Sequence, residues 1–284
     1  MRPEGAGHRE HHDRKARVQA FRGTALEKRM PEPRGRRHPL FLRMLKPVDP
    51  VYPDAVTRVA WDDDDLPEDF QGVVHIVTRH CASMRTWARQ LRELHEADKT
   101  YKTEEGLSRI SAAPLREANL RALGTSLDLY SEEGYELRSG RSAVRAYLTT
   151  DLLAVVTERT GANAVGFVSF SLKWAVDAFD AEEEIELELE LDQAWIAPEF
   201  RRRCWGELAV IAIAFATKRH IDHVQATTRW PREFSARLQL TVCADLYSHS
   251  GEALLAKCAE YVSFQFCFEP QRLEVSEIVL DGRW

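Results

Sequence analysis

The sequence contains little cysteine and no long hydrophobic run. Its five cysteines among 284 residues are scattered and include no C-x-x-C pair, which argues against a disulfide scaffold or a zinc cluster and is typical of a reducing compartment. The longest uninterrupted apolar run, at 208–216, has nine residues, whereas a membrane span needs about 18 or more. No apolar leader segment follows the basic N-terminal stretch. We therefore expect a cytoplasmic protein with no membrane partner.

Positive charge is concentrated near the N-terminus. Residues 1–38 hold nine Arg and two Lys against five Asp and Glu, which gives this segment about +6 in a chain whose formal net charge is −6. The segment lacks apolar periodicity, so we interpret it as a basic disordered tail. Contact with nucleic acid is the alternative, but the segment has almost no interleaved aromatic residues. Residues 39–70, with several prolines and an acidic run at 62–65, predict a linker and an acidic loop.

From about residue 71 onward the hydrophobic pattern alternates between strand and helix periods. Strand patterns occur at 73–77, 151–157, 164–174 and 184–196, and further strands are expected near 224–228, 262–268 and 273–280. Helix patterns occur at 82–98, 113–129, 206–220 and 251–261. The turn at 160–163 joins two of the strands into a hairpin. This order predicts an α/β fold with a mixed sheet covered on both faces.

The junction after the strand at 184–196 combines several features of an anion-binding site. A loop leads from this strand straight into the helix that begins near Gly206. The first amides of a helix lack intrahelical partners and point toward incoming negative charge. Arg201, Arg202 and Arg203 add positive charge there, and a glycine allows close approach of a ligand to the backbone.

These residues resemble motif A of the GNAT superfamily of acyl-CoA-dependent N-acetyltransferases. Ile196-Ala197-Pro198 resembles its Val-x-Pro element. Arg201, Cys204 and Gly206 fall on the arginine, the first glycine and the second glycine or alanine of its Arg/Gln-x-x-Gly-x-Gly/Ala loop. The order of elements from about residue 71 to the end is also similar. The sequence departs from the pattern at Cys204, which stands in place of a glycine, and it offers no clean match to the family's tyrosine general acid.

The resemblance implies a GNAT-like acyltransferase domain over residues 71–284, with a mostly antiparallel mixed central sheet and helices on both faces. It implies direct transfer of an acetyl group from acetyl-CoA to a primary amine, without a metal. The implied cofactor contacts are Ala194, Trp195, Ile196, Arg201, Arg202, Arg203, Cys204, Trp205 and Gly206. The alternative is a catalytically inactive GNAT-fold binding module, which the cysteine in the loop and the missing tyrosine favour.

Glu190, eleven residues before Arg201, falls where some members of the family hold a catalytic glutamate, so the resemblance implies that it is the general base. A base is needed because an ammonium must lose a proton before it attacks a thioester. Glu190 belongs to an alternating row in which it shares one strand face with Glu186, Glu188 and Asp192. This row is either the solvated face of an exposed strand or the lining of a groove. An acidic groove favours a cationic acceptor, such as a polyamine, an aminoglycoside or the end of a basic peptide.

Two further patterns have a structural and a functional interpretation. His220 and His223 have a spacing that occurs in metal sites, but no third ligand is evident, so we expect His220 to lie at a helix C-terminus together with Lys218 and Arg219. Cys204 at a helix N-terminus is a conceivable nucleophile, but no histidine partner is evident and the resemblance implies direct transfer.

Overall fold

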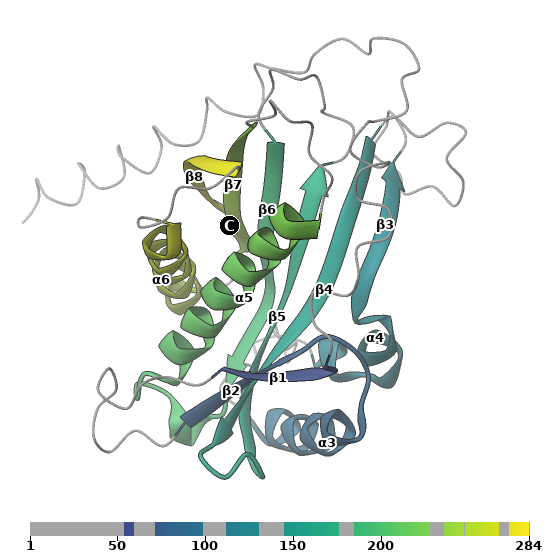
Figure 1. Cartoon of the computed structure of the whole chain (residues 1–284). Coiled ribbons are helices and arrows are strands. Elements are labelled where there is room, and N and C mark those ends of the chain that lie inside the picture. The colour runs from purple at the N-terminus through teal and green to yellow at the C-terminus, as the bar shows by residue number, and fades with distance from the viewer. Residues whose placement is uncertain are drawn as a thin grey trace, which may run out of the picture. The chain divides into compact units, whose positions relative to one another are not determined.

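The computed structural model describes residues 54–59, 72–98, 112–130, 145–175, 185–227, 236–246, 248–266 and 273–283. The predicted basic tail at 1–38 and the acidic run at 62–65 lie outside these ranges. The described residues are arranged around one eight-stranded sheet with helices against it (Figure 1).

The sheet is mixed and mostly antiparallel. Its strands are β1 (Val56–Val59), β2 (Gly72–Val77), β3 (Gly124–Tyr130), β4 (Arg145–Glu158), β5 (Ala164–Ala175), β6 (Ile185–Ile196), β7 (Ala236–Asp245) and β8 (Leu273–Arg283). The order across the sheet is β1-β2-β4-β5-β6-β7-β8, and β3 shares one edge of the long strand β4 with β2. Only the β6–β7 and β7–β8 pairs are parallel among the described strands. The predicted α/β class with a mostly antiparallel mixed sheet is confirmed.

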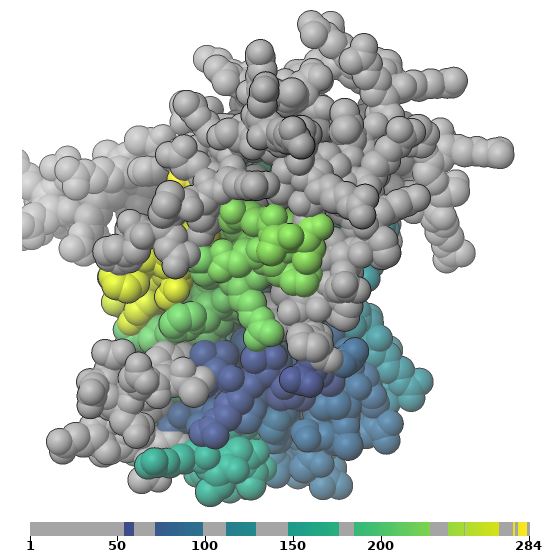
Figure 2. Space-filling view, viewed as in Figure 1, coloured from purple at the N-terminus to yellow at the C-terminus, as the bar shows by residue number. Residues whose placement is uncertain are grey.

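Helices cover both faces of the sheet. They are α3 (Ala82–Ala97), α4 (Glu117–Ala122), α5 (Trp205–Thr227) and α6 (His249–Phe266), with short 3-10 turns at Ala113–Leu115 and Pro198–Phe200. α5 and α6 pack against the face that carries Leu172 and Trp174, whereas α3 packs against the opposite face. Figure 2 shows the first of these faces, where the side chains of α5 (green) lie beside those of β1 and β2 (purple). None of the described helices is long and apolar enough to cross a lipid bilayer.

The prediction of a helix over 113–129 is wrong for the second half of that range. Only the 3-10 turn and α4 are helical, and residues from Gly124 onward form β3. Gly124 has a φ of +129°, a conformation that ordinary residues avoid, and this ends the helical stretch. Leu127, which falls within the predicted helix, instead lies in the strand with an exposed side chain. Pairing with β4 therefore overrides the local helical spacing of the leucines.

The prediction of strands near 224–228 and 262–268 is also wrong, because the described residues of both ranges are helical. α5 continues to Thr227 because the buried residues Thr217, Ile221 and Val224 extend its three- and four-residue spacing. α6 likewise continues to Phe266. The strand that follows α5 is β7, whose Leu238, Leu240 and Val242 are buried at a period of two. Like β3 and β7, β1 is a strand that the sequence did not predict, and it lies inside the range 39–70, for which the sequence predicts a linker and an acidic loop.

Candidate functional site

β6 is paired with its two neighbours over different lengths, and this difference defines the candidate site. Its parallel pairing with β7 ends where Leu191 lies opposite Ala244. Its antiparallel pairing with β5 continues to Ile196, opposite Gly166. A β-bulge between Leu191 and Gln193 leaves Asp192 as the extra residue. β6 and β7 therefore stop pairing at the bulge, and β6 runs on toward the loop without a β7 partner.

A glycine in β5 lets this end of β6 approach closely. A Cβ atom at Gly166 would lie 2.8 Å from the main-chain oxygen of Trp195 and would clash with the side chain of Ile196. Main-chain atoms cannot be displaced as a flexible side chain can. The missing side chain at Gly166 therefore sets the position of the β6 end from which the loop departs.

The loop reaches the N-terminus of α5 through an unusual backbone conformation. Arg202 and Cys204 have φ values of +62° and +61°, which place both in the left-handed region that glycine adopts most easily. The amide of Leu208 donates to the carbonyl of Cys204 at 2.9 Å, so Cys204 is the residue at the start of the helix. The first-turn amides of such a helix are available for an anion. The predicted anion site thus corresponds to a real strand–loop–helix junction.

Arg201 serves as an internal anchor of the loop. Its Nε donates to the carbonyl of Ile196 at 2.8 Å, and its guanidinium pairs with the carboxylate of Asp98. Asp98 is buried at the end of α3 and also accepts from Nε1 of Trp195 at 3.1 Å. Arg201 therefore ties the loop to β6 and α3, whereas the side chains of Arg202 and Arg203 are exposed at the surface.

The predicted cofactor residues divide into main-chain and side-chain candidates. The side chains of Trp195 and Trp205 are buried in the two hydrophobic cores. Only their main-chain atoms remain available to a ligand. Ala194 and Ile196 are half-buried, and Cys204 is exposed. The junction therefore offers backbone groups at 194–196 and at the helix start, together with two exposed arginines.

A carboxylate lies within the first turn of α5. Glu207 accepts a hydrogen bond from the hydroxyl of Tyr261 at 2.7 Å, and Lys257 lies 3.8 Å from it. The hydrogen bond to Glu207, followed by burial, raises the pKa of Tyr261 to about 12. These contacts hold the Glu207 carboxylate toward α6. A carboxylate in the first turn stabilises the helix but competes with an incoming anion for its positive end.

The face of the sheet opposite α5 and α6 carries two rows of polar residues across four strands, which we call the polar face. Strand pairing places Asp151, Ser171, Glu190 and Cys243 in one row and Thr149, Lys173, Glu188 and Thr241 in the next. Residues paired across strands point to the same face. Asp192 at the bulge adjoins the first row. The acidic residues of β6 thus face other polar side chains as well as solvent.

Lys173 neutralises two of these carboxylates. Its ammonium contacts Glu190 and lies 3.5 Å from Glu188. Burial disfavours the charged form of Lys173, but the hydrogen bond and the charge of Glu190, with that of Glu188, outweigh burial and raise its pKa. Asp151 and Asp192 have no ion-pair partner among the described residues. The polar face therefore keeps uncompensated negative charge on both sides of the Lys173–Glu190 pair.

The pKa values of these two aspartates are raised first by burial and then by neighbouring negative charge. Restricted solvation and the neighbouring Glu190 charge raise the pKa of Asp192 to about 7, although the residue as a whole is exposed. Burial and then the charge of Asp128 raise the pKa of Asp151. At neutral pH, Asp192 is therefore close to the midpoint between its acid and base forms. A carboxylate in that state both accepts and releases protons readily.

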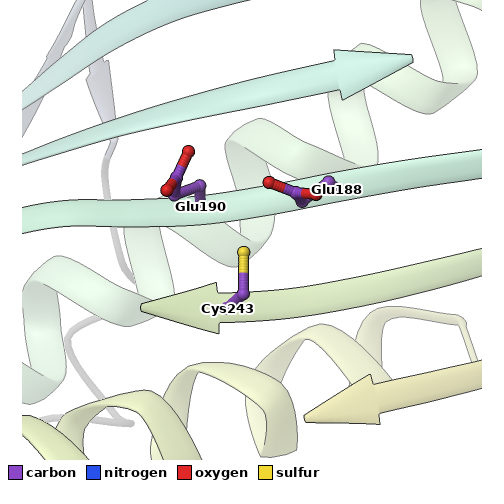
Figure 3. A group of neighbouring side chains, drawn as sticks. All are labelled: Glu188, Glu190 and Cys243. Carbon is purple, nitrogen blue, oxygen red and sulfur yellow. The ribbon is translucent and has the colours of Figure 1, made fainter. Parts of the chain in front are cut away.

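Glu188, Glu190 and Cys243 bring their oxygen and sulfur atoms within 4.8 Å of one another (Figure 3). The two carboxylates come from β6, and the thiol of the buried Cys243 points from β7 toward them. Oxygen and sulfur donors at this spacing are able to ligate a metal ion. The ammonium of Lys173 already contacts both carboxylates, however, and a metal would have to displace it.

His220 lies inside α5, which corrects the expectation that it ends the helix. It is buried, and its Nε2 accepts from Nε1 of Trp174 at 2.9 Å. Burial lowers the pKa of His220 to about 3, so the imidazole is neutral at pH 7. Lys218 is not at the helix end either, and it pairs with Asp222 one turn along. His220 thus belongs to the core.

The sequence interpretation missed the partners that complete the polar face. It identified Glu190 but not Lys173, Ser171 or Asp151. A signal for two of them was present, because Ser169, Ser171 and Lys173 recur at a period of two within the otherwise apolar β5.

Comparison with known proteins adds no relative: no family model, no curated protein and no solved structure matches the chain.

Proposed function

We propose that the protein is a GNAT-like N-acetyltransferase that moves an acetyl group from acetyl-CoA to a cationic primary amine. The observation that carries this proposal is the end of β6–β7 pairing at a bulge, directly before a loop that opens the N-terminus of α5. Such a gap between parallel strands leaves a strand edge for an extended arm. The helix end beside it suits a pyrophosphate.

In this proposal the pantetheine arm of acetyl-CoA runs along the β6 main chain at Ala194, Trp195 and Ile196. The pyrophosphate binds the amides at the start of α5, around Gly206. Arg202 and Arg203, exposed beside that helix end, contribute charge to phosphate binding. Arg201 acts as a positioning residue, because its guanidinium is engaged by Asp98 and the Ile196 carbonyl.

The chemistry requires a proton acceptor near the thioester. The carboxylate of Glu190 is already occupied by its contact with the Lys173 ammonium. We therefore assign proton acceptance to Asp192, two residues closer to the gap, and give Glu190 the role of holding Lys173. Asp192 takes a proton from the substrate ammonium, and the free amine attacks the thioester carbon. A C–N bond forms, the C–S bond breaks, and the departing coenzyme A thiolate takes up the second proton that the attacking nitrogen releases.

Two observations at the loop favour a second candidate function, which does not use acetyl-CoA. The guanidinium of Arg201 is turned inward, and Glu207 adds negative charge to the first helical turn. Both would weaken binding of a phosphate. They favour a catalytically inactive binding module of similar fold, in which the polar face still binds cations but acetyl-CoA is not used.

Calorimetric titration with acetyl-CoA separates the two functions. We expect saturable binding, and we expect the double charge reversal Arg202→Glu with Arg203→Glu to weaken it at least about tenfold, because two phosphate contacts are reversed. Arg159→Glu, an exposed arginine in the β4–β5 turn, is the matched control and should bind as wild type. No heat at millimolar acetyl-CoA from a folded sample would eliminate the acetyltransferase and leave the binding module.

A further inference from the structure

Three hydroxyl groups on the polar face have no hydrogen-bond partner. The Oγ atoms of Ser169 and Ser171 and Oγ1 of Thr149 are buried and unpaired within the described part of the chain. The residues themselves are 8%, 2% and 5% exposed. A buried hydroxyl without a partner is destabilising, because its lost hydrogen bonds to water are not replaced. Among the described residues, these three hydroxyls leave hydrogen-bonding capacity on one face that a bound water or a ligand would satisfy.

The unpaired hydroxyls lie beside the unpaired carboxylate of Asp151. Strand pairing places Ser171 opposite Asp151 on one side and Glu190 on the other. Thr149 lies one step along the same face of β4, opposite Lys173. Ser171 and Thr149 thus flank Asp151 on the polar face.

An ammonium group matches this set of acceptors. It has three N–H donors and no acceptor, and Asp151, Ser171 and Thr149 offer one carboxylate and two hydroxyl oxygens. The face already binds one ammonium in this manner, because Lys173 lies between Glu188 and Glu190. A neutral or anionic ligand would add no positive charge beside Asp151, whose pKa is raised by burial and by the charge of Asp128 in spite of the nearby Lys173.

We propose that Asp151, Ser171 and Thr149 form a second ammonium site, so that the acceptor substrate is a diamine or polyamine rather than a monoamine. This inference rests on the proposed function for the fate of the other amine. One end of the molecule is anchored at the second site on β4 and β5, and the other end reaches Asp192 at the β6 bulge. The anchored ammonium keeps its proton and does not react. Selectivity for diamines then arises from two cation contacts separated by an alkyl chain.

The test measures amine binding directly, without acetyl-CoA. The full chain is titrated calorimetrically with putrescine and with n-butylamine, which has the same carbon chain but only one ammonium. A hydrogen-bonded charge contact is worth about one to two orders of magnitude in affinity, so putrescine should bind at least about tenfold more tightly. Asp151→Asn and Ser171→Ala should each remove most of this preference and leave butylamine binding unchanged.

Glu96→Gln is the matched control, because Glu96 is an exposed carboxylate on α3 and its loss removes the same charge. It should keep the preference for putrescine. Circular dichroism checks the fold, and Ser171→Ala carries the test if Asp151→Asn fails to fold. Three results would each overturn the second ammonium site. The first is equal affinity for the two amines, and the second is an undiminished preference for putrescine in both variants. The third is binding heat with magnesium chloride but none with putrescine.

Failure of this inference and failure of the proposed function give different results. A putrescine preference lost in Asp151→Asn, in a protein that does not bind acetyl-CoA, supports the second ammonium site and removes the acetyltransferase. Binding of acetyl-CoA without a putrescine preference retains the acetyltransferase and removes the second ammonium site.

Discussion

The guanidinium of Arg201 pairs with the carboxylate of Asp98, a residue 103 positions earlier in the chain. Arg201 belongs to the loop that opens α5, and Asp98 directly follows α3. The same carboxylate accepts from the indole of Trp195, near the end of β6. One buried charge therefore holds three segments of the candidate site together. It also removes Arg201 from the set of side chains free to bind phosphate.

The first prediction concerns this ion pair. Arg201→Ala leaves the buried carboxylate of Asp98 without its cation, and breaking a buried pair in this way costs about 3–5 kcal/mol. Because the Arg201 side chain is 27% exposed, we expect a smaller loss of about 2–3 kcal/mol in chemical denaturation. Arg201→Ala combined with Asp98→Asn removes the uncompensated charge and should recover part of the loss. A single variant as stable as wild type would show that Asp98 does not depend on Arg201.

A second prediction follows from the backbone at Cys204. Its φ of +61° costs a non-glycine residue about 1–2 kcal/mol, whereas glycine raises the entropy of the unfolded chain by about 0.4–1 kcal/mol. Cys204→Gly should therefore leave stability unchanged or raise it by up to about 1 kcal/mol. It should also bind acetyl-CoA at least as tightly. Arg203→Gly, at a position without positive φ, is the control for stability and should melt lower. Loss of stability in Cys204→Gly equal to that of Arg203→Gly would contradict this account.

The third prediction concerns pH and His220. The folded-state pKa is about 3, whereas an unfolded histidine has a pKa of about 6.5. Below pH 6.5 the imidazole binds a proton in the unfolded chain but not in the folded chain. The free energy of unfolding therefore falls as pH decreases, by about 1.4 kcal/mol per pH unit from this residue. His220→Gln keeps an acceptor for Trp174 but does not titrate. Its urea midpoint should fall less steeply than that of wild type between pH 6.5 and 4, and parallel curves would argue against a buried neutral His220.

The fourth prediction distinguishes the two candidate bases. With acetyl-CoA and a polyamine, kcat/KM should rise with pH through about 7 as Asp192 loses its proton. Asp192→Asn should lower the rate by about two to four orders of magnitude, which is the usual contribution of a general base. It should also remove the rise of kcat/KM with pH. Glu190→Gln should retain the rise, since its proposed role is to hold Lys173. If Glu190→Gln instead abolishes the rise and Asp192→Asn keeps it, Glu190 is the base, as the sequence resemblance implies.

The sequence by itself determined those elements whose signal is local. The alternation of Ile185, Leu187, Leu189 and Leu191 with acidic residues predicted β6 and its two faces, and the structure buries all four. The turn at 160–163 predicted the β4–β5 hairpin. The apolar composition of the segment at 206–220 predicted a buried helix. These patterns depend on residues a few positions apart, so neighbouring side chains are enough to specify them.

Only the tertiary structure decided which polar side chains face one another. Lys173 contacts Glu190 because β5 and β6 pair in one register, and a shift of one residue would turn either side chain to the opposite face. The bulge at Asp192 and the end of β6–β7 pairing at Leu191 arise from strand pairing and leave no local trace in the sequence. The Arg201–Asp98 pair joins segments 103 residues apart. Long-range pairing of this kind depends on the packing of the whole sheet, which no local period encodes.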